Sequence, residues 1–270
     1  MILASQAAAA GCTSSGVHAT ARIRAISVGE ETALPVLAGA GPFDLRRHRP
    51  QGNQARVCIL GVMSAPLGGD RLRLEAAVEP GAHLHVTTAA ATIALRGPTP
   101  GHATYDVHLS VGEQASLHWL PEPLISAARS NLRQSCTVDL AAGARLVLRE
   151  EQVLGRAGEP PGRLTTRLTV RHDRRPLLDQ QNTYGPDAPG WDGPAVLAGH
   201  RAAGQLLVVD PAFDDKPPDV RLFGDDPAHG QAVLTPLAGP AVLVTALAPD
   251  ALRLRRLLDA AYPICGGRFW

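Results

Sequence analysis

The chain has 270 residues, of which 19% are charged and 4% are aromatic, and its formal net charge is +1. This composition offers neither the basic stripe nor the aromatic platforms that nucleic-acid binding uses, and no stretch approaches the ~18 continuous apolar residues of a membrane span. The four cysteines form no C-x-x-C pair and the first residues carry no basic leader region, so we expect reduced thiols in a cytoplasmic protein.

The N-terminal residues 1–20 are rich in small side chains and can bury little, so we expect a flexible arm there. The remainder, 21–270, has a length that all-β chains often fold as one domain. Two strands are predicted at its start, over 21–28 and 56–62. A connection rich in Gly, Pro and Arg, 39–55, separates them.

An internal repeat occupies the centre of the chain, over 68–156. Gly81, Gly112 and Gly143 recur every 31 residues, and each lies between two segments of alternating apolar residues. Strict alternation places the apolar side chains on one face of an extended strand, and repetition at a fixed period lets neighbouring units bury those faces by stacking. The sequence therefore predicts a mainly β fold, a β-helix-like or solenoid stack of strands.

Beyond the repeats, alternating residues at 163–170 and 176–182 predict a further hairpin around Asp173. Two segments dense in Gly, Pro and Asp, 185–193 and 210–218, are predicted loops. Near the end, Asp250 precedes apolar residues at helical spacing over 251–261. This pattern predicts one C-terminal helix with Asp250 as its N-cap, in a fold with one or two helices in all.

Histidines lie on the predicted strands of the repeats. His83 and His85 share a strand face, at the spacing of a metal-binding pair, and His108 and His118 follow in the next repeat. No carboxylate or cysteine accompanies them regularly, which favours unshared surface histidines over metal ligands.

Carboxylates are the more suggestive residues. Asp70 follows two glycines, Glu122 follows a Trp-Leu-Pro corner, and Glu150 and Glu151 interrupt an apolar strand. Adjacent residues of a strand point to opposite faces, so one of this last pair must face inward, where a charged group needs a partner or a ligand. The structural alternative is a buried ion pair with an arginine close in sequence, which would be Arg71, Arg73 or Arg149.

Motifs of catalysis are missing: the sequence contains no G-x-S-x-G, S-x-x-K or H-E-x-x-H. One enzyme hypothesis nevertheless remains, a β-helix carbohydrate-active enzyme that uses Asp70, Glu122 or Glu150 as its acid pair. The shortage of aromatic residues for sugar faces and the missing export signal count against it.

A series of motifs in order along the chain resembles the urease accessory protein family UreD, also called UreH. The motifs are GGDRLRLE at 68–75, TTAAAT at 87–92, LHWLPEPLI at 117–125, VDLAAGARLVLRE at 138–150, LGR at 154–156, GPAVLAGH at 193–200, LTPLAGPAVLVTAL at 234–247 and the closing Arg268, Phe269 and Trp270. Any one of them is weak, but their order and spacing together are specific.

The resemblance implies a nickel-urease maturation factor that is not an enzyme and holds no cofactor of its own. It implies a scaffold or chaperone that binds UreF, and through UreF the GTPase UreG, and that docks on urease apoprotein. Nickel in transit would pass to urease through an internal channel. A path that must release Ni(II) suits carboxylates better than imidazole or thiolate, which bind the ion tightly.

Carried over residue by residue, the resemblance assigns the transient nickel path to Asp70 and Glu150. Thr87 and Thr88, which match the family's small polar pair, and Glu122 are further candidates for lining the channel. A pure interaction scaffold with the same partners and no metal path is left open, because the sequence does not separate it from nickel conduction.

Overall fold

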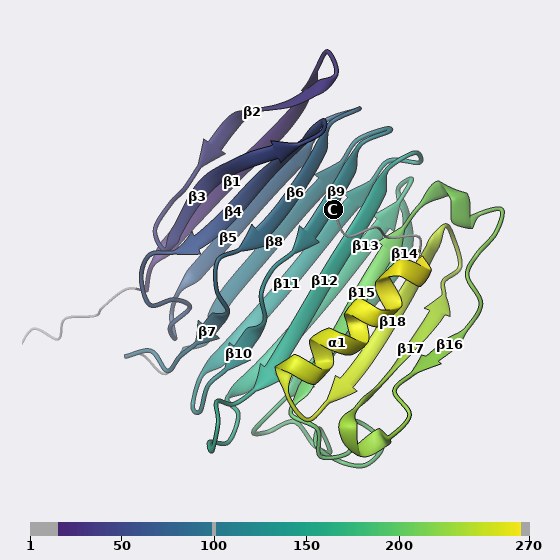
Figure 1. The fold of residues 1–270 in the computed structure, drawn as a ribbon. Coiled ribbons are helices and arrows are strands. Elements are labelled where there is room, and N and C mark those ends of the chain that lie inside the picture. Colours follow the sequence, from purple (N-terminus) through teal and green to yellow (C-terminus); the bar gives the residue numbers. More distant parts are fainter. Residues whose placement is uncertain (1–15, 99–100, 266–270) are drawn as a thin grey trace, which may run out of the picture.

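The computed structural model describes residues 16–98 and 101–265. Figure 1 shows two β-sheets stacked face to face, with one α-helix on the outside of one of them. The strands are β1 (His18–Val28), β2 (Glu31–Ala38), β3 (Phe43–Gln51), β4 (Gln54–Gly61), β5 (Arg71–Val78), β6 (His83–Thr88), β7 (Thr92–Ala94), β8 (Ala103–Val111), β9 (Ser116–Leu120), β10 (Leu124–Ser126), β11 (Asn131–Leu140), β12 (Arg145–Leu154), β13 (Arg163–His172), β14 (Arg175–Tyr184), β15 (Ala202–Val209), β16 (Arg221–Phe223), β17 (Gln231–Pro236) and β18 (Ala241–Ala248).

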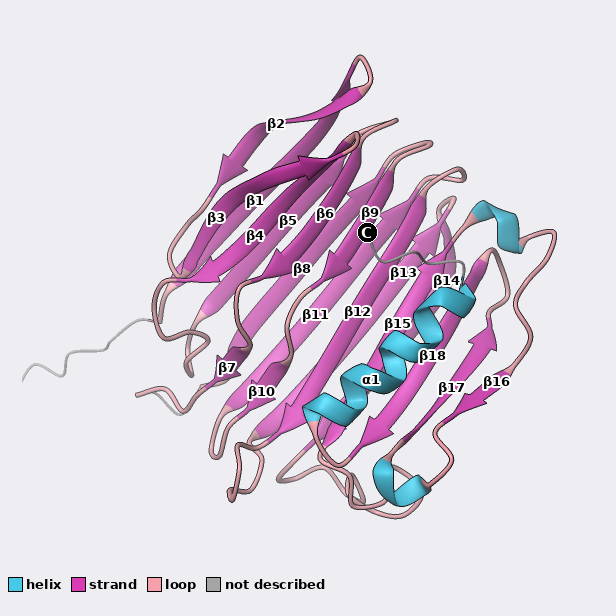
Figure 2. Ribbon diagram, viewed as in Figure 1, coloured by secondary structure: helices cyan, strands magenta, loops and turns pink. Residues whose placement is uncertain are grey.

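The helical elements are few (Figure 2). They are the α-helix α1 (Ala251–Ala261) and the short 3-10 turns η1 (Pro211–Phe213), η2 (Pro227–His229) and η3 (Tyr262–Cys265). The predicted mainly β fold is confirmed: residues 16–98 and 101–265 form a β-solenoid of about four turns with one α-helix, near the C-terminus.

The repeats form the solenoid as the alternation predicts. Each repeat runs one strand in the first sheet, turns at its glycine, and runs the next strand in the second sheet. The first sheet has the order β14-β13-β11-β8-β5-β1-β2, and the second the order β16-β17-β18-β15-β12-β9-β6-β4-β3 with β10 and β7 attached through β12. Strands of successive repeats are parallel, in register and without a shift, so equivalent side chains stack into rows between the sheets.

The repeat glycines are required because the turns stack closely. A Cβ added at Gly112 would lie 2.7 Å from the backbone nitrogen of Pro80 in the neighbouring turn, a distance that no side chain tolerates. Gly81 instead has a positive φ of 71°, which glycine adopts without strain. The two glycines thus serve one architecture for two different reasons.

Two hydrophobic cores follow from the layering. The main core lies between the sheets and consists of the inward positions of the repeats, such as Leu74, Leu117 and Leu146. The second lies between α1 and the outer face of the second sheet, where Leu254 and Leu258 of the helix pack on β12, β15 and β18. As predicted, the Asp250 carboxylate caps α1 by accepting a hydrogen bond from the Arg253 backbone N–H at 2.8 Å.

Three boundaries differ from the sequence prediction. The segment 39–55 is not only a connection, because β3 runs through it as the edge strand of the second sheet. A further strand, β2, forms the edge of the first sheet. The first described strand already begins at His18, inside the range assigned to the N-terminal arm, and residues 1–15 lie outside the described part of the chain, as do Arg268, Phe269 and Trp270.

Candidate functional site

A layer of polar side chains crosses the otherwise apolar space between the two sheets. On the second sheet it contains Thr88 of β6, Glu150 of β12 and Gln205 of β15, and the last two are directly paired in the strand register. On the first sheet Tyr105, Gln134 and Thr166 occupy one row of adjacent, in-register positions. We call these six residues the polar layer; they interrupt runs of inward-facing leucine, valine and alanine.

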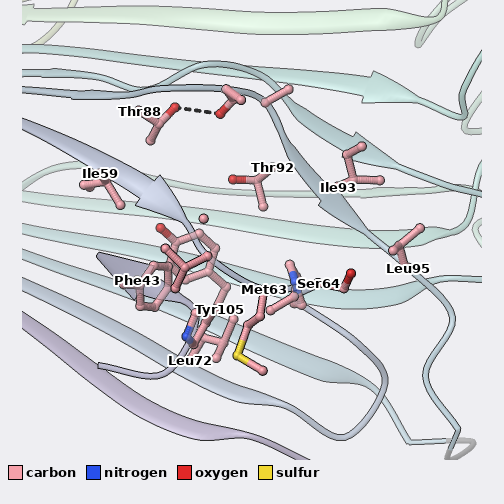
Figure 3. Close-up of a pocket in the computed structure, with 17 residues that line it drawn as sticks. Phe43, Ile59, Met63, Ser64, Leu72, Thr88, Thr92, Ile93, Leu95 and Tyr105 are labelled. Carbon is pink, nitrogen blue, oxygen red and sulfur yellow. Dashed lines mark hydrogen bonds between the residues drawn. The ribbon is translucent and has the colours of Figure 1, made fainter. Parts of the chain in front are cut away.

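Two cavities meet at this layer. The outer cavity has a volume of about 480 Å³. Its lining includes Phe43, Ile59, Met63 and Ile93 (Figure 3). The Met63 side chain is half exposed to solvent. The inner cavity, of about 40 Å³, is lined by residues that include Gln134, Cys136 and Glu150. Thr88, Thr92 and Tyr105 line both cavities, so the two cavities adjoin at these residues, two of which belong to the polar layer.

Glu150 is the one of the three glutamates lining the inner cavity, beside Glu122 and Glu151, that has no ion-pair partner among the described residues. It is buried, and its Oε2 accepts a hydrogen bond from Nε2 of Gln205 at 2.7 Å. No arginine pairs with it among the described residues. Burial raises the pKa of Glu150 to about 7, and the hydrogen bond from Gln205 opposes that rise only in part. The buried ion pair with a nearby arginine, the structural alternative from the sequence, is therefore not formed at Glu150; it is formed at Glu151, which pairs with Arg149.

Glu151 faces the other way and has the opposite surroundings. Its carboxylate accepts hydrogen bonds from Nε of Arg255 on α1 at 2.9 Å and pairs with Arg149 at 3.4 Å. Arg255 also reaches Glu122, at 3.2 Å, and Arg149 reaches Asp259 at 3.7 Å. We call these five residues the helix clamp, because they join α1 to β12 and to the corner before β10.

The polar pair Thr87 and Thr88 is split between the two faces of β6. Thr88 lines both cavities, and its hydroxyl donates to the Ala90 carbonyl at 3.0 Å and accepts from the Glu122 backbone N–H at 2.9 Å (Figure 3). Thr87 follows the alternation to the outer face. Glu122 lines the inner cavity while its carboxylate belongs to the helix clamp.

Asp70 lies apart from both cavities. Its carboxylate accepts hydrogen bonds from the backbone N–H groups of Val17, at 2.8 Å, and Leu67, at 2.7 Å, and the residue is only 2% exposed. These bonds fasten the start of β1 to the loop before β5. The structure therefore does not bring Asp70 together with Glu150.

Removing the Asp70 side chain should destabilise the protein. We expect Asp70→Ala to lower the free energy of unfolding by about 3 kcal/mol, because two partly buried N–H groups lose a buried, charged acceptor. Urea unfolding of the variant, beside Asp215→Ala as an exposed control, measures the effect. A stability within about 0.5 kcal/mol of the wild type would show that water replaces the carboxylate freely.

The histidines do not assemble a metal site of three or more ligands. His85 and His118 lie side by side on the outer face of the second sheet, with ring centroids 5.7 Å apart. Burial lowers the pKa of both to about 4, with a further contribution from His118 and nearby arginines at His85 and from His83 at His118. Among the described residues, no group of at least three His, Cys, Asp or Glu side chains is arranged to hold a metal ion.

Several residues of the interior were missed by sequence reasoning. The residues around Glu150 that it did not single out are Gln134, Cys136, Gln180, Tyr184 and Gln205. Burial raises the pKa of the Cys136 thiol well above its usual range. One signal was available: Gln205 is the only strongly polar residue in the strand AAGQLLVV. A lone polar residue in a fully buried strand marks a position that needs an internal partner.

Known proteins match nearly the whole chain. The family described as UreD urease accessory protein matches residues 17–268. Urease accessory protein UreD 2 of Saccharopolyspora erythraea is 65% identical over 246 residues, which cover 91% of this chain and 87% of the relative. Urease accessory protein UreD 3 of Streptomyces griseus is 64% identical over 250 residues, covering 91% and 95%. UreD of Streptomyces avermitilis is 59% identical over 256 residues, covering 94% and 100%.

These matches define the class of protein as an accessory factor of urease, a class distinct from catalytic enzymes. The chain belongs to the UreD family of urease accessory proteins, as its motifs predicted. Its role therefore lies in urease maturation. Within residues 16–98 and 101–265, no helix has the length and apolar character that crossing a membrane demands.

Proposed function

We propose that this chain delivers nickel to urease by passing the ion through the space between its two sheets. In this proposal the chain acts in the cytoplasm as a scaffold that joins UreF, and through it UreG, to urease apoprotein. The observation that carries the proposal is Glu150, a buried carboxylate on the wall of a cavity, with which none of the described arginines pairs. Such a group is costly to bury in its charged form unless it binds a proton or a cation.

The chemistry of the polar layer supports transit better than storage. Its side chains offer carboxylate, amide and hydroxyl oxygens, which bind Ni(II) more weakly than imidazole or thiolate and so permit its release. In this proposal the ion would enter through the outer cavity and pass Thr88, Thr92 and Tyr105, which line both cavities. Glu150 therefore carries the proposed path, with Thr88 as a lining residue.

Asp70 enters the proposal in a different place. Its second hydrogen bond holds Leu67, and the adjacent Pro66 lines the outer cavity. Asp70 thus supports the rim of the opening, and contact between its carboxylate and nickel stays a prediction. Thr87 and Glu122 remain candidates for contact with nickel, although Thr87 points outward and Glu122 is paired with Arg255.

Deleting the chain from a urease-positive host should abolish most urease activity at limiting nickel. The apoprotein would still be made, but its nickel content per active site should fall with its activity. Both quantities are measured on purified urease from the deletion strain, with and without the chain restored on a plasmid. Full activity and full nickel content in the deletion strain at limiting nickel would refute the proposal.

A further inference from the structure

Glu150 is held by a chain of two glutamine side chains that spans the interior. Gln205 of β15 donates through Nε2 to Oε2 of Glu150 at 2.7 Å. Gln180 of β14, on the opposite sheet, donates through its own Nε2 to Oε1 of Gln205. All three side chains face the space between the sheets, and Gln205 and Glu150 are buried.

The direction of these hydrogen bonds fixes the Gln205 amide. Its Oε1 accepts from Gln180 and its Nε2 donates to Glu150. A flip of the amide would place its NH₂ group against the NH₂ group of Gln180 and its oxygen against the carboxylate of Glu150, so both hydrogen bonds would be lost. The carboxylate of Glu150 is bound at Oε2 and makes no other hydrogen bond within the described residues. Its second oxygen, Oε1, is therefore left for whatever enters the inner cavity.

Gln180 and Gln205 lie where the part of the fold that has two facing sheets ends. β14 is the edge strand of the first sheet, whereas the second sheet continues past β15 to β18. Thr245 of β18, the register partner of Gln205, is already exposed. Gln180 and Gln205 thus bridge the sheets at the last position where both are present.

We propose that Gln205 is a positioning residue for nickel transit, which aims one oxygen of Glu150 into the inner cavity, and that Gln180 orients Gln205. This inference rests on the proposed passage of nickel past Glu150 and adds the device that prepares the carboxylate. A hydrogen bond to a charged group is worth more than a factor of ten in an equilibrium constant, so its loss is measurable.

The test replaces each glutamine by methionine, which keeps the length and volume of the side chain and removes its hydrogen bonds. In a urease-positive host at limiting nickel, we expect Gln205→Met to lower the nickel content of urease about tenfold. Gln180→Met should give a smaller loss of the same kind. Gln181→Met is the matched control, because Gln181 lies on the outer face of the same strand, and it should have no effect.

A double substitution separates positioning from general support of the fold. If Gln205 acts through Glu150, the variant Glu150→Gln with Gln205→Met should lose no more nickel transfer than Glu150→Gln alone. Binding of Ni(II) to the purified protein, followed by equilibrium dialysis with nickel salt alone, should show the same non-additivity. Losses that multiply in the double variant would overturn the inference.

Two further outcomes keep this inference apart from the proposed function. Unchanged nickel transfer in Gln205→Met, beside impaired transfer in Glu150→Gln, overturns the positioning role and leaves the passage intact. Unchanged transfer in Glu150→Gln overturns both. If Gln205→Met does not accumulate as folded protein, nickel transfer by Gln180→Met tests the inference instead. That variant keeps the donor and acceptor of the hydrogen bond between Gln205 and Glu150, and it removes only the hydrogen bond that holds the Gln205 amide in one orientation.

Discussion

Replacing Glu150 by glutamine should make the protein more stable above pH 7 while removing most of its contribution to nickel delivery. Glutamine keeps the volume and can still exchange a hydrogen bond with Gln205, but it has no charge to attract Ni(II). Urease from cells that carry the variant should therefore approach the nickel content of the deletion strain. Co-purification of the chain with its partners should remain near the wild-type level.

The gain in stability follows from the raised pKa of Glu150. In the folded protein this pKa is about 7, against an ordinary value of 4.5, so the folded state binds the proton more tightly than the unfolded chain does. The contribution of Glu150 to stability is thus most favourable below the ordinary value, falls as the pH rises through the interval up to about 7, and stays low above it.

The magnitude is large enough to measure. Because one pKa unit corresponds to about 1.4 kcal/mol, the neutral glutamine should raise the free energy of unfolding by about 3 kcal/mol at pH 8 and by little at pH 4. Urea unfolding of both proteins at several pH values tests this. A variant less stable than the wild type at pH 8 would mean that the carboxylate is a structural partner, and normal nickel delivery would remove Glu150 from the path.

Replacing the next residue should have the reverse effect. Glu151→Ala leaves Arg149, which is buried, without its carboxylate and frees Arg255 from β12. Breaking a buried ion pair on one side typically lowers stability by about 3–5 kcal/mol, and we expect a loss in that range with detachment of α1. Calorimetric or urea unfolding measures the loss, and protease cleavage near α1 reports the detachment.

The matched control for the helix clamp is Arg256→Ala. Arg256 follows Arg255 on α1 but is exposed, so its removal should change stability by no more than about 0.5 kcal/mol. Equal losses in Arg256→Ala and Glu151→Ala would contradict the clamp, since the loss would then not depend on the ion pairs of Glu151.

The regular part of this fold could be predicted because it repeats. Alternation around Gly81, Gly112 and Gly143 defined which residues face inward, and Asp250 with the helical spacing after it defined α1. The edge strands β2 and β3 escaped prediction because Pro35 and the arginines of β3 are unfavourable in a paired strand, and edge strands tolerate such residues.

The candidate site was predictable only in part, for a related reason. Local alternation says that Glu150 and Glu151 face opposite ways, but the outer face of β12 becomes a second interior only when α1 covers it. Arg255, 104 residues away from Glu151 along the chain, supplies the partner, and no local pattern announces a contact over such a distance. Gln180 and Gln205 lie on different sheets, so no local sequence pattern predicts the hydrogen bond between them.

Because the strands of successive repeats pair without a shift, the number of residues in each repeat determines which side chains face the interior. Inserting a single residue between Gly143 and Glu150 would turn every following side chain of β12 to the other face. If that insertion precedes Arg149, Arg149 would take the place of Glu150 in the cavity, and Glu150 would take the place of Glu151 in the helix clamp. A substitution changes one side chain, whereas a one-residue change in length changes the face on which every later side chain of the strand lies. Insertions and deletions among relatives should therefore collect in the turns and loops, and the paired strands of the repeats should keep their lengths.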